Sequence, residues 1–280
     1  MTFAAILYGL ASALTWGAGD FGGGIASKKS SPYAVVIWGD LVGMSVVAIL
    51  AITLGDPLPS LRSMGFIVLS SFCGSIGIVI FYRALAGGQM SIAAPVSALM
   101  AAVIPVFVGV IMDGWPKWLT MAGVFLALLA IGLIARTEHG GRHRIHWTDV
   151  KMPLLAGVLF GLFFIFMHEG SSESTLWPAV FLRVSSVVLL SFIALATRST
   201  FSVFRKHWWL VVFVGVFDIT GNIFYILSSQ LGRMDIAAVV GSLYPGVTVA
   251  LAGFLLKEKI SLPQWFGIAL ALTAIVLISV

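Results

Sequence analysis

The stretch "GGQMSIAAPVSAL" at residues 87–99 returns 144 residues later as "LGRMDIAAVVGSL" at residues 231–243. Without a gap, the two stretches share a glycine, a methionine, an Ile-Ala-Ala run and a closing leucine. The same register continues through three further identities: Gly109/Gly253, Gly123/Gly267 and Ala127/Ala271. Identities at one fixed spacing indicate an internal duplication. The sequence therefore predicts a chain built from two copies of one unit.

The composition predicts that both units lie in a lipid bilayer. Hydrophobic residues make up 60% of the 280 residues, and charged residues only 10%. A soluble domain carries about a quarter charged residues, so this chain lacks the polar groups to cover a water-facing surface. The sequence pI near 9.6 does not indicate nucleic-acid binding, because the basic residues lie in short gaps between apolar runs, where they meet lipid headgroups. The lone cysteine, Cys73, excludes an intrachain disulfide.

Apolar runs set the number of membrane spans, because a spanning helix needs roughly 20 apolar residues. Ten runs qualify, at residues 3–24, 33–53, 64–86, 91–112, 117–135, 152–169, 176–196, 208–230, 235–256 and 263–280. One long break, at residues 136–151, separates the fifth run from the sixth. We expect an all-α membrane protein with ten transmembrane helices. It consists of a first five-helix repeat at residues 1–136, a basic connecting loop at 137–151 and a second five-helix repeat at 152–280.

The odd number of helices in each repeat determines their relative topology. After five spans the chain is on the far side of the membrane, so the second repeat enters from the opposite face. Such inverted repeats are typical of secondary transporters, whose two halves move about a site near the midplane. We expect a central cavity lined by the first, third, fourth, sixth, eighth and ninth helices, with the fifth and tenth outside.

Two motifs resemble a known family. The first run contains a Trp-Gly pair at residues 16–17, and residues 255–278 read "LLKEKISLPQWFGIALALTAIVLI". These features resemble the EamA family of the drug/metabolite transporter superfamily, in which a Gly-Glu-Arg-like stretch, a Gln and a Gly precede the last apolar run. Lys257, Glu258, Lys259, Gln264 and Gly267 stand in these places. The corresponding stretch of the first half, "MDGWPKW" at 112–118, lacks the glutamate. The resemblance implies a metabolite exporter, such as an amino-acid exporter, with a central cavity between its halves.

The charges of the short loops bear on orientation. Most lysines and arginines follow the first, fifth, seventh and ninth runs. The positive-inside rule places these loops in the cytoplasm and both termini outside, whereas the family resemblance implies cytoplasmic termini. In either orientation we expect a multi-pass integral protein of a prokaryotic plasma (inner) membrane.

Ionisable side chains within a membrane span are candidates for function by default. In the first run, Trp16 and Asp20 are four residues apart and share a helix face. Glycines surround Asp20, and they permit close packing or a local break in the helix. We interpret this face as a cavity wall that a ligand approaches. The alternative is that Asp20 reaches the headgroups or Lys28.

A polar stripe marks the eighth run. Its members fall at i, i+4, i+7 and i+11: Asp218, Asn222, Tyr225 and Ser229. Lipid penalises a buried acid by a few kcal/mol, so the stripe must face protein or water. A purely structural polar cluster is the alternative to a binding surface.

Aromatic side chains of other runs are further candidates. Tyr244, beside Pro245, is a candidate ligand contact or a core tyrosine. The candidates for stacking on a ring of the ligand are Trp16, Tyr82 and Tyr225.

Two further groups of charges are expected to pair. Arg83, at the end of the third run, is predicted to neutralise Asp20 or Asp40. Such a pair would be functional or would simply hold the first three helices together.

His168, Glu169 and Arg183 are expected near the opposite face, with Glu169 and Arg183 pairing across the hairpin. We do not expect Asp40 to pair with Arg183. Each lies about seven residues, or ~10 Å, from opposite faces of a ~30 Å core, which leaves roughly 10 Å between their depths.

No motif indicates catalysis. Walker, Gly-x-Ser-x-Gly and His-Glu-x-x-His patterns are absent from the sequence, so we expect neither an enzyme nor a cofactor. The histidines of the long break have helical spacing, but arginines lie between them and favour a solvated basic loop over a metal site; they are His139, His143 and His146.

The sequence thus predicts a secondary active exporter of a small polar or amphipathic metabolite, working by alternating access. Its expected partners are that substrate, the lipid bilayer and, as a candidate coupling ion, the proton, with Asp20 or Asp218 changing protonation between conformations. Nucleic acid is not expected, and the protein should be a monomer or weak homodimer. Two alternatives remain open. One is a non-transporting sensor or assembly subunit, and the other is a multidrug cation carrier, which would use a single acid without paired polar groups.

Overall fold

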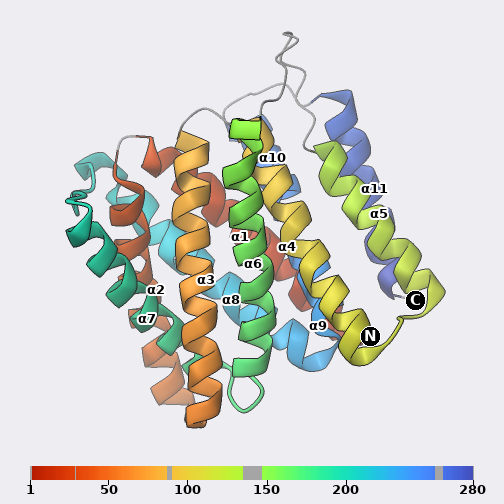
Figure 1. Cartoon of the computed structure of the whole chain (residues 1–280), viewed down its shortest axis with the longest axis horizontal. Coiled ribbons are helices and arrows are strands. Elements are labelled where there is room, and N and C mark those ends of the chain that lie inside the picture. Colours follow the sequence, from red (N-terminus) through yellow and green to blue (C-terminus); the bar gives the residue numbers. More distant parts are fainter. Residues whose placement is uncertain (1, 29, 87–89, 135–146, 256–260, 280) are drawn as a thin grey trace.

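The computed structural model describes residues 2–28, 30–86, 90–134, 147–255 and 261–279. These residues form eleven α-helices and one short 3-10 helix, and none of them lies in a β-strand (Figure 1). The first half contains α1 (Phe3–Ser27), α2 (Pro32–Leu54), α3 (Leu61–Ala86), α4 (Met90–Asp113) and α5 (Trp118–Ile134). The second half contains α6 (Trp147–Gly170), α7 (Leu176–Ala196), η1 (Arg205–His207), α8 (Trp208–Leu231), α9 (Met234–Gly241), α10 (Tyr244–Leu255) and α11 (Leu262–Ser279).

Length and composition make the chain a multi-pass membrane protein. Within the described ranges, seven segments are long and apolar enough to cross a membrane: Pro32–Leu54, Leu61–Ala84, Val96–Asp113, Lys151–Gly170, Leu176–Ala196, Arg205–Leu231 and Met234–Leu255. Two shorter apolar helices accompany them, at Trp118–Leu133 and Leu262–Ile278. Helix α1 is 25 residues long, but its glycines, hydroxyl side chains and Asp20 make it less apolar than these segments.

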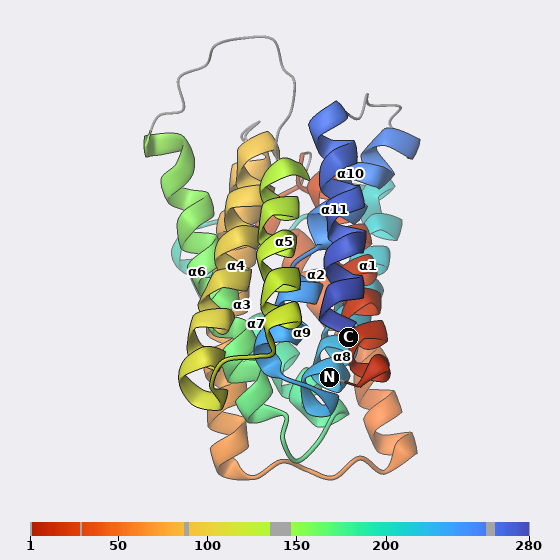
Figure 2. The same ribbon diagram turned by 90° about the vertical axis from the view of Figure 1, so that its right-hand side faces the viewer.

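The helices repeat with one constant spacing. Each helix of the first half begins 144 residues before an element of the second: 3 and 147, 32 and 176, 61 and 205, 90 and 234, 118 and 262. The register found at residues 87–99 therefore extends over both halves, including the first two helices of each. In Figures 1 and 2, the N and C labels lie at the same end of the molecule, which we call the termini face. Helices α1 and α9 begin at this face, whereas α6 and α4 begin at the opposite one.

Two boundaries differ from those expected. The ninth run is not one helix, because α9 ends at Gly241 and α10 begins at Tyr244. Pro245 is the second residue of α10, a position in the first turn where its missing N–H costs no helical hydrogen bond and its fixed backbone angle favours the start of a helix. Helix α6 begins at Trp147, inside the segment expected as a loop, because a helix can extend beyond the apolar core into the headgroup region.

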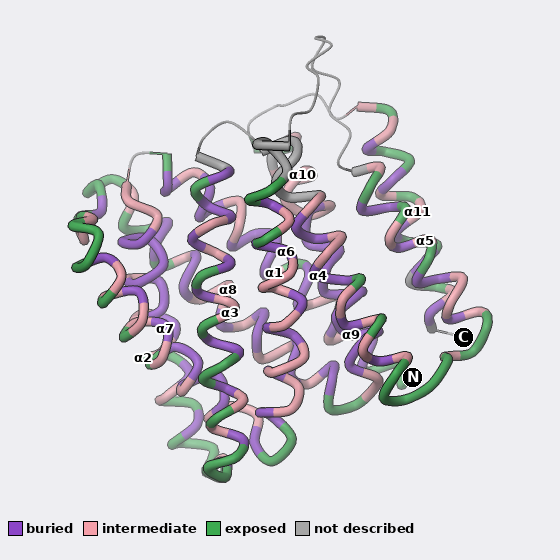
Figure 3. The backbone as a smooth tube through the Cα atoms, in the orientation of Figure 1, coloured by how far each residue is buried: buried purple, intermediate pink, exposed green. Residues whose placement is uncertain are grey.

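The two halves interleave rather than pack as separate bodies. Helices α1 and α2 pack on α8, and α1 also packs on α9 and α10; we call this group the first bundle. Helices α6 and α7 pack on α3, and α6 also packs on α4; this group is the second bundle. Each bundle thus joins the first two helices of one half to later helices of the other. Helices α5 and α11 pair along one side (Figure 1), and buried residues line the interior of the molecule (Figure 3).

Glycines allow α2 and α8 to touch through their backbones. A Cβ on Gly215 would overlap the carbonyl oxygen of Gly39, and a Cβ on Gly43 would lie 2.8 Å from the carbonyl oxygen of Gly215. Gly215→Ala is therefore expected to force the helices apart and to lower the free energy of unfolding by about 1–3 kcal/mol. Thermal unfolding of the purified protein measures this loss.

Gly65→Ala is the matched control for this prediction. Gly65 lies in α3 and has no atom within 4 Å of the added Cβ. Alanine also favours a helix over glycine by about 1 kcal/mol, so this variant should be as stable as the parent or more stable. Equal destabilisation by the two substitutions would show that the contact between α2 and α8 is not close.

Candidate functional site

A cavity lies between the two bundles. Its volume is about 110 Å³, which is room for several water molecules. Residues of α1, α2, α3, α4, α6, α7, α8 and α10 line it. Its aromatic lining residues are Trp16, Tyr82, Phe160, Phe163, Phe164 and Tyr244. The expected set of lining helices omitted α2 and α7, and these two helices bring Asp40 and Arg183 to the cavity.

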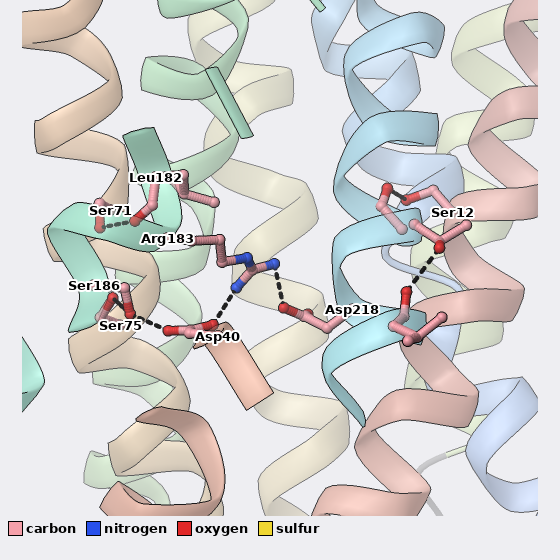
Figure 4. A network of polar contacts seen from close by, with 11 residues as sticks. Ser12, Asp40, Ser71, Ser75, Leu182, Arg183, Ser186 and Asp218 are labelled. Carbon is pink, nitrogen blue, oxygen red and sulfur yellow. Dashed lines mark hydrogen bonds and ion pairs between the residues drawn. The ribbon is translucent and has the colours of Figure 1, made fainter. Parts of the chain in front are cut away.

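Arg183 is the centre of a buried polar network (Figure 4). Its Nη1 lies 2.6 Å from Oδ1 of Asp40, and its Nη2 forms an ion pair with Asp218. Ser75 donates a 2.6 Å hydrogen bond to Ser186, which in turn donates to Asp40. The side chains of Arg183 and Asp40 are only 8% and 5% exposed, whereas that of Asp218 is 38% exposed. One guanidinium from the second bundle therefore holds two carboxylates of the first.

The observed pairing corrects the expectation for Asp40 and Arg183. The depth argument excluded this pair, but Asp40 is the ninth residue of α2 and Arg183 the eighth of α7. Asp40 thus lies one residue deeper than the argument assumed and Arg183 at the assumed depth, so the long arginine side chain bridges most of the gap. The predicted pair of Glu169 with Arg183 is wrong because the guanidinium is engaged by Asp40 and Asp218.

Arg83 does not neutralise a cavity acid, contrary to the prediction. Its Nη2 donates a 2.8 Å hydrogen bond to the hydroxyl of Tyr33, and its guanidinium lies 4.9 Å from the centre of the Tyr33 ring. The side chain is exposed near the end of α3. Arg83 thus joins the two bundles at the face opposite the termini, outside the cavity lining.

Helix α1 presents Trp16 and Asp20 to the cavity. The glycine-rich segment is an uninterrupted helix, so the glycines serve close packing. A Cβ on Gly17 would lie 2.6 Å from the carbonyl oxygen of Tyr244, and one on Gly221 would lie 2.5 Å from the indole of Trp16. The backbones of α1, α8 and α10 therefore approach closely around the acid.

Aromatic rings separate the cavity from the termini face. The ring centres of Trp16 and Phe164 lie 5.6 Å apart, those of Phe164 and Tyr225 4.8 Å, and those of Trp16 and Tyr225 5.9 Å. The Tyr225 hydroxyl donates a 2.8 Å hydrogen bond to the Phe164 carbonyl oxygen. All three side chains are buried. Tyr225 thus closes the cavity on this side and is not one of its lining residues.

Polar contacts close the termini face beyond these rings. Asp56, which follows α2, accepts hydrogen bonds from the Ser174 hydroxyl at 2.6 Å and from the N–H groups of Leu176 and Trp177 at 2.8 and 3.0 Å. Partial burial opposes ionisation of Asp56, but these hydrogen bonds outweigh it and lower its pKa below the usual value. We call this contact between the end of α2 and the start of α7 the Asp56 latch.

Contacts beside the Asp56 latch also cross between the bundles. Gln230, near the end of α8, donates through Nε2 to the carbonyl oxygen of Ser171 at 2.5 Å. Arg233 donates through Nη2 to the carbonyl oxygen of Gly114 at 2.9 Å, and it forms a 2.8 Å ion pair with the buried Asp235. The termini face is therefore closed by several polar contacts between the first and second bundles.

The structure brings together eight of the twelve candidate residues. Those that line the cavity are Trp16, Asp20, Asp40, Tyr82, Arg183, Asp218, Asn222 and Tyr244. Those that lie outside its lining are Arg83, His168, Glu169 and Tyr225. His168 and Glu169 belong to the last turn of α6, beside the termini face. The loop histidines, His139, His143 and His146, lie outside the described residues.

Sequence reasoning missed three residues of this arrangement. Ser186 follows Arg183 by three positions, which places both on one face of α7, and this spacing could have revealed it. Ser75 and Asp56 carry no such local signal, because each meets its partner from a distant part of the chain.

Equivalent positions of the two repeats line the cavity. Residues 144 positions apart line it in both halves: Trp16/Phe160, Asp20/Phe164, Gly39/Arg183, Ser71/Gly215, Gly74/Asp218 and Ile78/Asn222. In most of these pairs one copy is polar or charged and the other is apolar or glycine. The cavity is therefore built at equivalent places in the two halves, while its charges come from only one member of each pair.

Comparison with known proteins fits this architecture. The sequence pattern of the EamA-like transporter family matches residues 3–136 and, a second time, residues 149–280. This confirms both the resemblance and the two-copy organisation. An uncharacterized protein of Methanocaldococcus jannaschii is 25% identical over 133 residues, which are 48% of this chain and 97% of that protein. An uncharacterized transporter of Synechocystis is 22% identical over 172 residues, which are 58% of this chain and 50% of that protein.

A solved structure has the same fold. A protein of known crystal structure superposes with a TM-score of 0.80 at 15% identity, covering 99% of this chain and 96% of its own. This likeness concerns the fold, whereas the family match covers nearly the whole chain in two copies. The chain belongs to the EamA-like transporter family.

Proposed function

We propose that this membrane transporter is a secondary active exporter of a small polar or amphipathic metabolite, such as an amino acid. It works in a prokaryotic plasma membrane as a monomer or weak dimer, and it opens its central cavity alternately to the two sides. The observation that carries this proposal is the Arg183 network, in which a charge of the second bundle holds two charges of the first across the cavity. Contacts of this kind can form in one conformation and separate in another.

We further propose that the two repeats have inverted topology. The support is that α1 begins at the termini face and α6 at the opposite one, although the two helices are equivalent in the 144-residue register. In such a pair of repeats, exchanging the conformations of the two halves turns an opening toward one side into an opening toward the other.

Protons are proposed as the coupling ion, carried by Asp20 or Asp218. The groups that face Asp20 are Asp218 on α8, Tyr82 on α3 and Tyr244 on α10, with Arg183 and Asp40 beyond Asp218. Three carboxylates and one guanidinium cannot all be charged at low cost in a site of low dielectric. A change of distance from Arg183 would alter this balance, so proton uptake or release can accompany the movement of the bundles.

Flux through liposomes containing the purified protein tests this function. A panel of labelled amino acids, amines and nucleosides should include compounds that exchange across the membrane, at rates that depend on pH. If Asp20 or Asp218 carries the proton, its asparagine variant should still exchange substrate but should lose the pH dependence. Retention of the parent's pH dependence by both variants would exclude these acids as the coupling groups.

The same flux experiment distinguishes the proposed exporter from a sensor or assembly subunit and from a multidrug cation carrier. A sensor or assembly subunit would show no flux for any compound of the panel. A multidrug cation carrier would exchange many unrelated cations. The observation that favours this second candidate is Asp20, a cavity acid without an ion-pair partner among the residues that the structure describes.

A further inference from the structure

Asp20 is a carboxylate to which the described part of the chain offers no hydrogen-bond or ion-pair partner. A Cβ on Gly19 would lie 3.7 Å from the backbone nitrogen of Asp218, so α1 and α8 bring the two acids to the same wall of the cavity. The nearby cation is already engaged, because Arg183 pairs with Asp218 and Asp40. Asp20 is therefore left facing the cavity without a counter-ion from the residues described.

Two buried polar side chains independently point to a ligand. Asn222 is only 3% exposed and Tyr82 only 2%, and both line the cavity. Neither side chain forms a hydrogen bond with any residue that the structure describes. Both side chains line the cavity, so their polar groups are available to a bound molecule with hydrogen-bonding groups. A purely structural cluster would be expected to satisfy these groups within the protein.

The charged side chains of the cavity determine which charge the expected ligand should carry. Asp20, Asp40 and Asp218 all belong to the first bundle, and they face one guanidinium of the second. A ligand with a net negative charge would add to this surplus of carboxylates in a poorly solvated site, whereas an ammonium group placed beside Asp20 would offset it. An ammonium also donates several hydrogen bonds, which the Asn222 carbonyl and the Tyr82 hydroxyl can accept.

The aromatic lining suits the rest of such a molecule. Trp16 and Phe164 form the side of the cavity toward the termini face, with ring centres 5.6 Å apart. Aromatic faces attract cations and bury apolar groups, with a gain of about 0.5–2 kcal/mol for a well-placed cation. We propose that the cavity binds an organic ammonium ion, with Asp20 as its counter-ion and the aromatic rings of Trp16 and Phe164 against its apolar part. This inference rests on the proposed function in taking the cavity as the transport site.

Three probes with one shape and different charges test this. They are 2-phenylethylammonium, the neutral 2-phenylethanol and the anion 3-phenylpropanoate, with binding to the purified protein in detergent followed by calorimetry. We expect the ammonium to bind at least about tenfold more tightly than the alcohol, which corresponds to about 1.4 kcal/mol, and the anion to bind most weakly. Asp20→Asn should reduce the ratio between ammonium and alcohol to about one. Asp20→Glu, which keeps the charge, should retain part of it.

Asp113→Asn is the matched control, because Asp113 is an exposed carboxylate at the end of α4 and not a cavity residue. In this variant the ratio of the affinities for the ammonium and the alcohol should equal that of the parent. Thermal unfolding checks that each variant is folded. Equal affinities for the three probes, no binding of any probe, or a preference that survives Asp20→Asn would overturn the inference. Binding does not require movement across a membrane. Flux without ammonium preference would therefore contradict this inference alone, and ammonium binding without flux would contradict the proposed function alone.

Discussion

Replacing Arg183 with methionine is expected to destabilise the protein more than any other single change to the cavity. The substitution leaves Asp40, whose side chain is 5% exposed, beside Asp218 without the cation that both contact. Removing one partner of a buried ion pair costs about 3–5 kcal/mol, because the remaining charge is neither paired nor solvated. The partial exposure of Asp218 places the expected loss nearer the lower value. Thermal unfolding of the purified variant measures it.

Three further variants, Arg83→Met, Asp40→Asn alone and Asp40→Asn combined with Arg183→Met, show whether this loss comes from the charges. Arg83→Met makes the same substitution at an exposed arginine whose described partner is Tyr33, and it should change stability by less than about 1 kcal/mol. The double variant with Asp40→Asn and Arg183→Met removes one charge of each sign, so it should recover part of the lost stability. A double variant with the sum of the two single losses would show that Asp40 and Arg183 do not interact.

Asp56→Asn is expected to open the termini face. The ionised carboxylate accepts three hydrogen bonds of 3.0 Å or less from the start of α7, and a hydrogen bond to a charged group contributes about 1.5–3 kcal/mol. Weakening this contact should raise the fraction of molecules open to the termini face by about tenfold, since 1.4 kcal/mol is a factor of ten. The reporter is Ile78→Cys in a Cys73→Ser background, because Ile78 lines the cavity and Cys73 is the chain's single cysteine. A membrane-impermeant thiol reagent is added at the termini face.

The pH range of this effect follows from the pKa of Asp56. Hydrogen bonding lowers that pKa, so the group stabilises the closed face wherever it is ionised, and this contribution is lost only as the pH falls below about 4. The ratio of labelling rates between Asp56→Asn and its parent should therefore be constant from pH 6 to 8. Thr53→Val, at the same end of α2, should label like the parent, because the Thr53 hydroxyl donates to carbonyl oxygens of its own helix. No change in rate for Asp56→Asn would mean that the latch does not hold this face closed.

Much of the fold follows from the sequence because bilayer thickness and helix geometry leave few options. The identities at residues 87–99 and 231–243 set a register that predicts the starts of α6, α7, α9 and α11 from their first-half counterparts, and that of η1, just before α8, from α3. The ninth apolar run reads as one span, and the sequence did not reveal that α9 and α10 separate at residues 242–243. The interleaving of the two halves was also not predictable, because it depends on which apolar faces pack together.

The site was predictable by residue type but not by partner. Asp20, Asp40, Arg183 and Asp218 were each recognised as ionisable groups within apolar runs, and all four line the cavity. Their pairing depends on small differences in depth, which counting residues from assumed helix ends does not resolve. The closing contacts of Asp56 and Gln230 depend on loops brought together by the fold, and a single sequence carries no local sign of such contacts.

The most direct test of alternating access is labelling of Ile78→Cys from each side of the membrane, in vesicles of known orientation. Ile78 lines the same cavity as Asn222, its equivalent in the other half. If one cavity opens alternately to the two sides, the impermeant reagent should modify this cysteine when added to either side. After complete reaction from one side, no unmodified thiol should be left to react from the other. Modification from only one side, in the parent and in Asp56→Asn alike, would contradict the account.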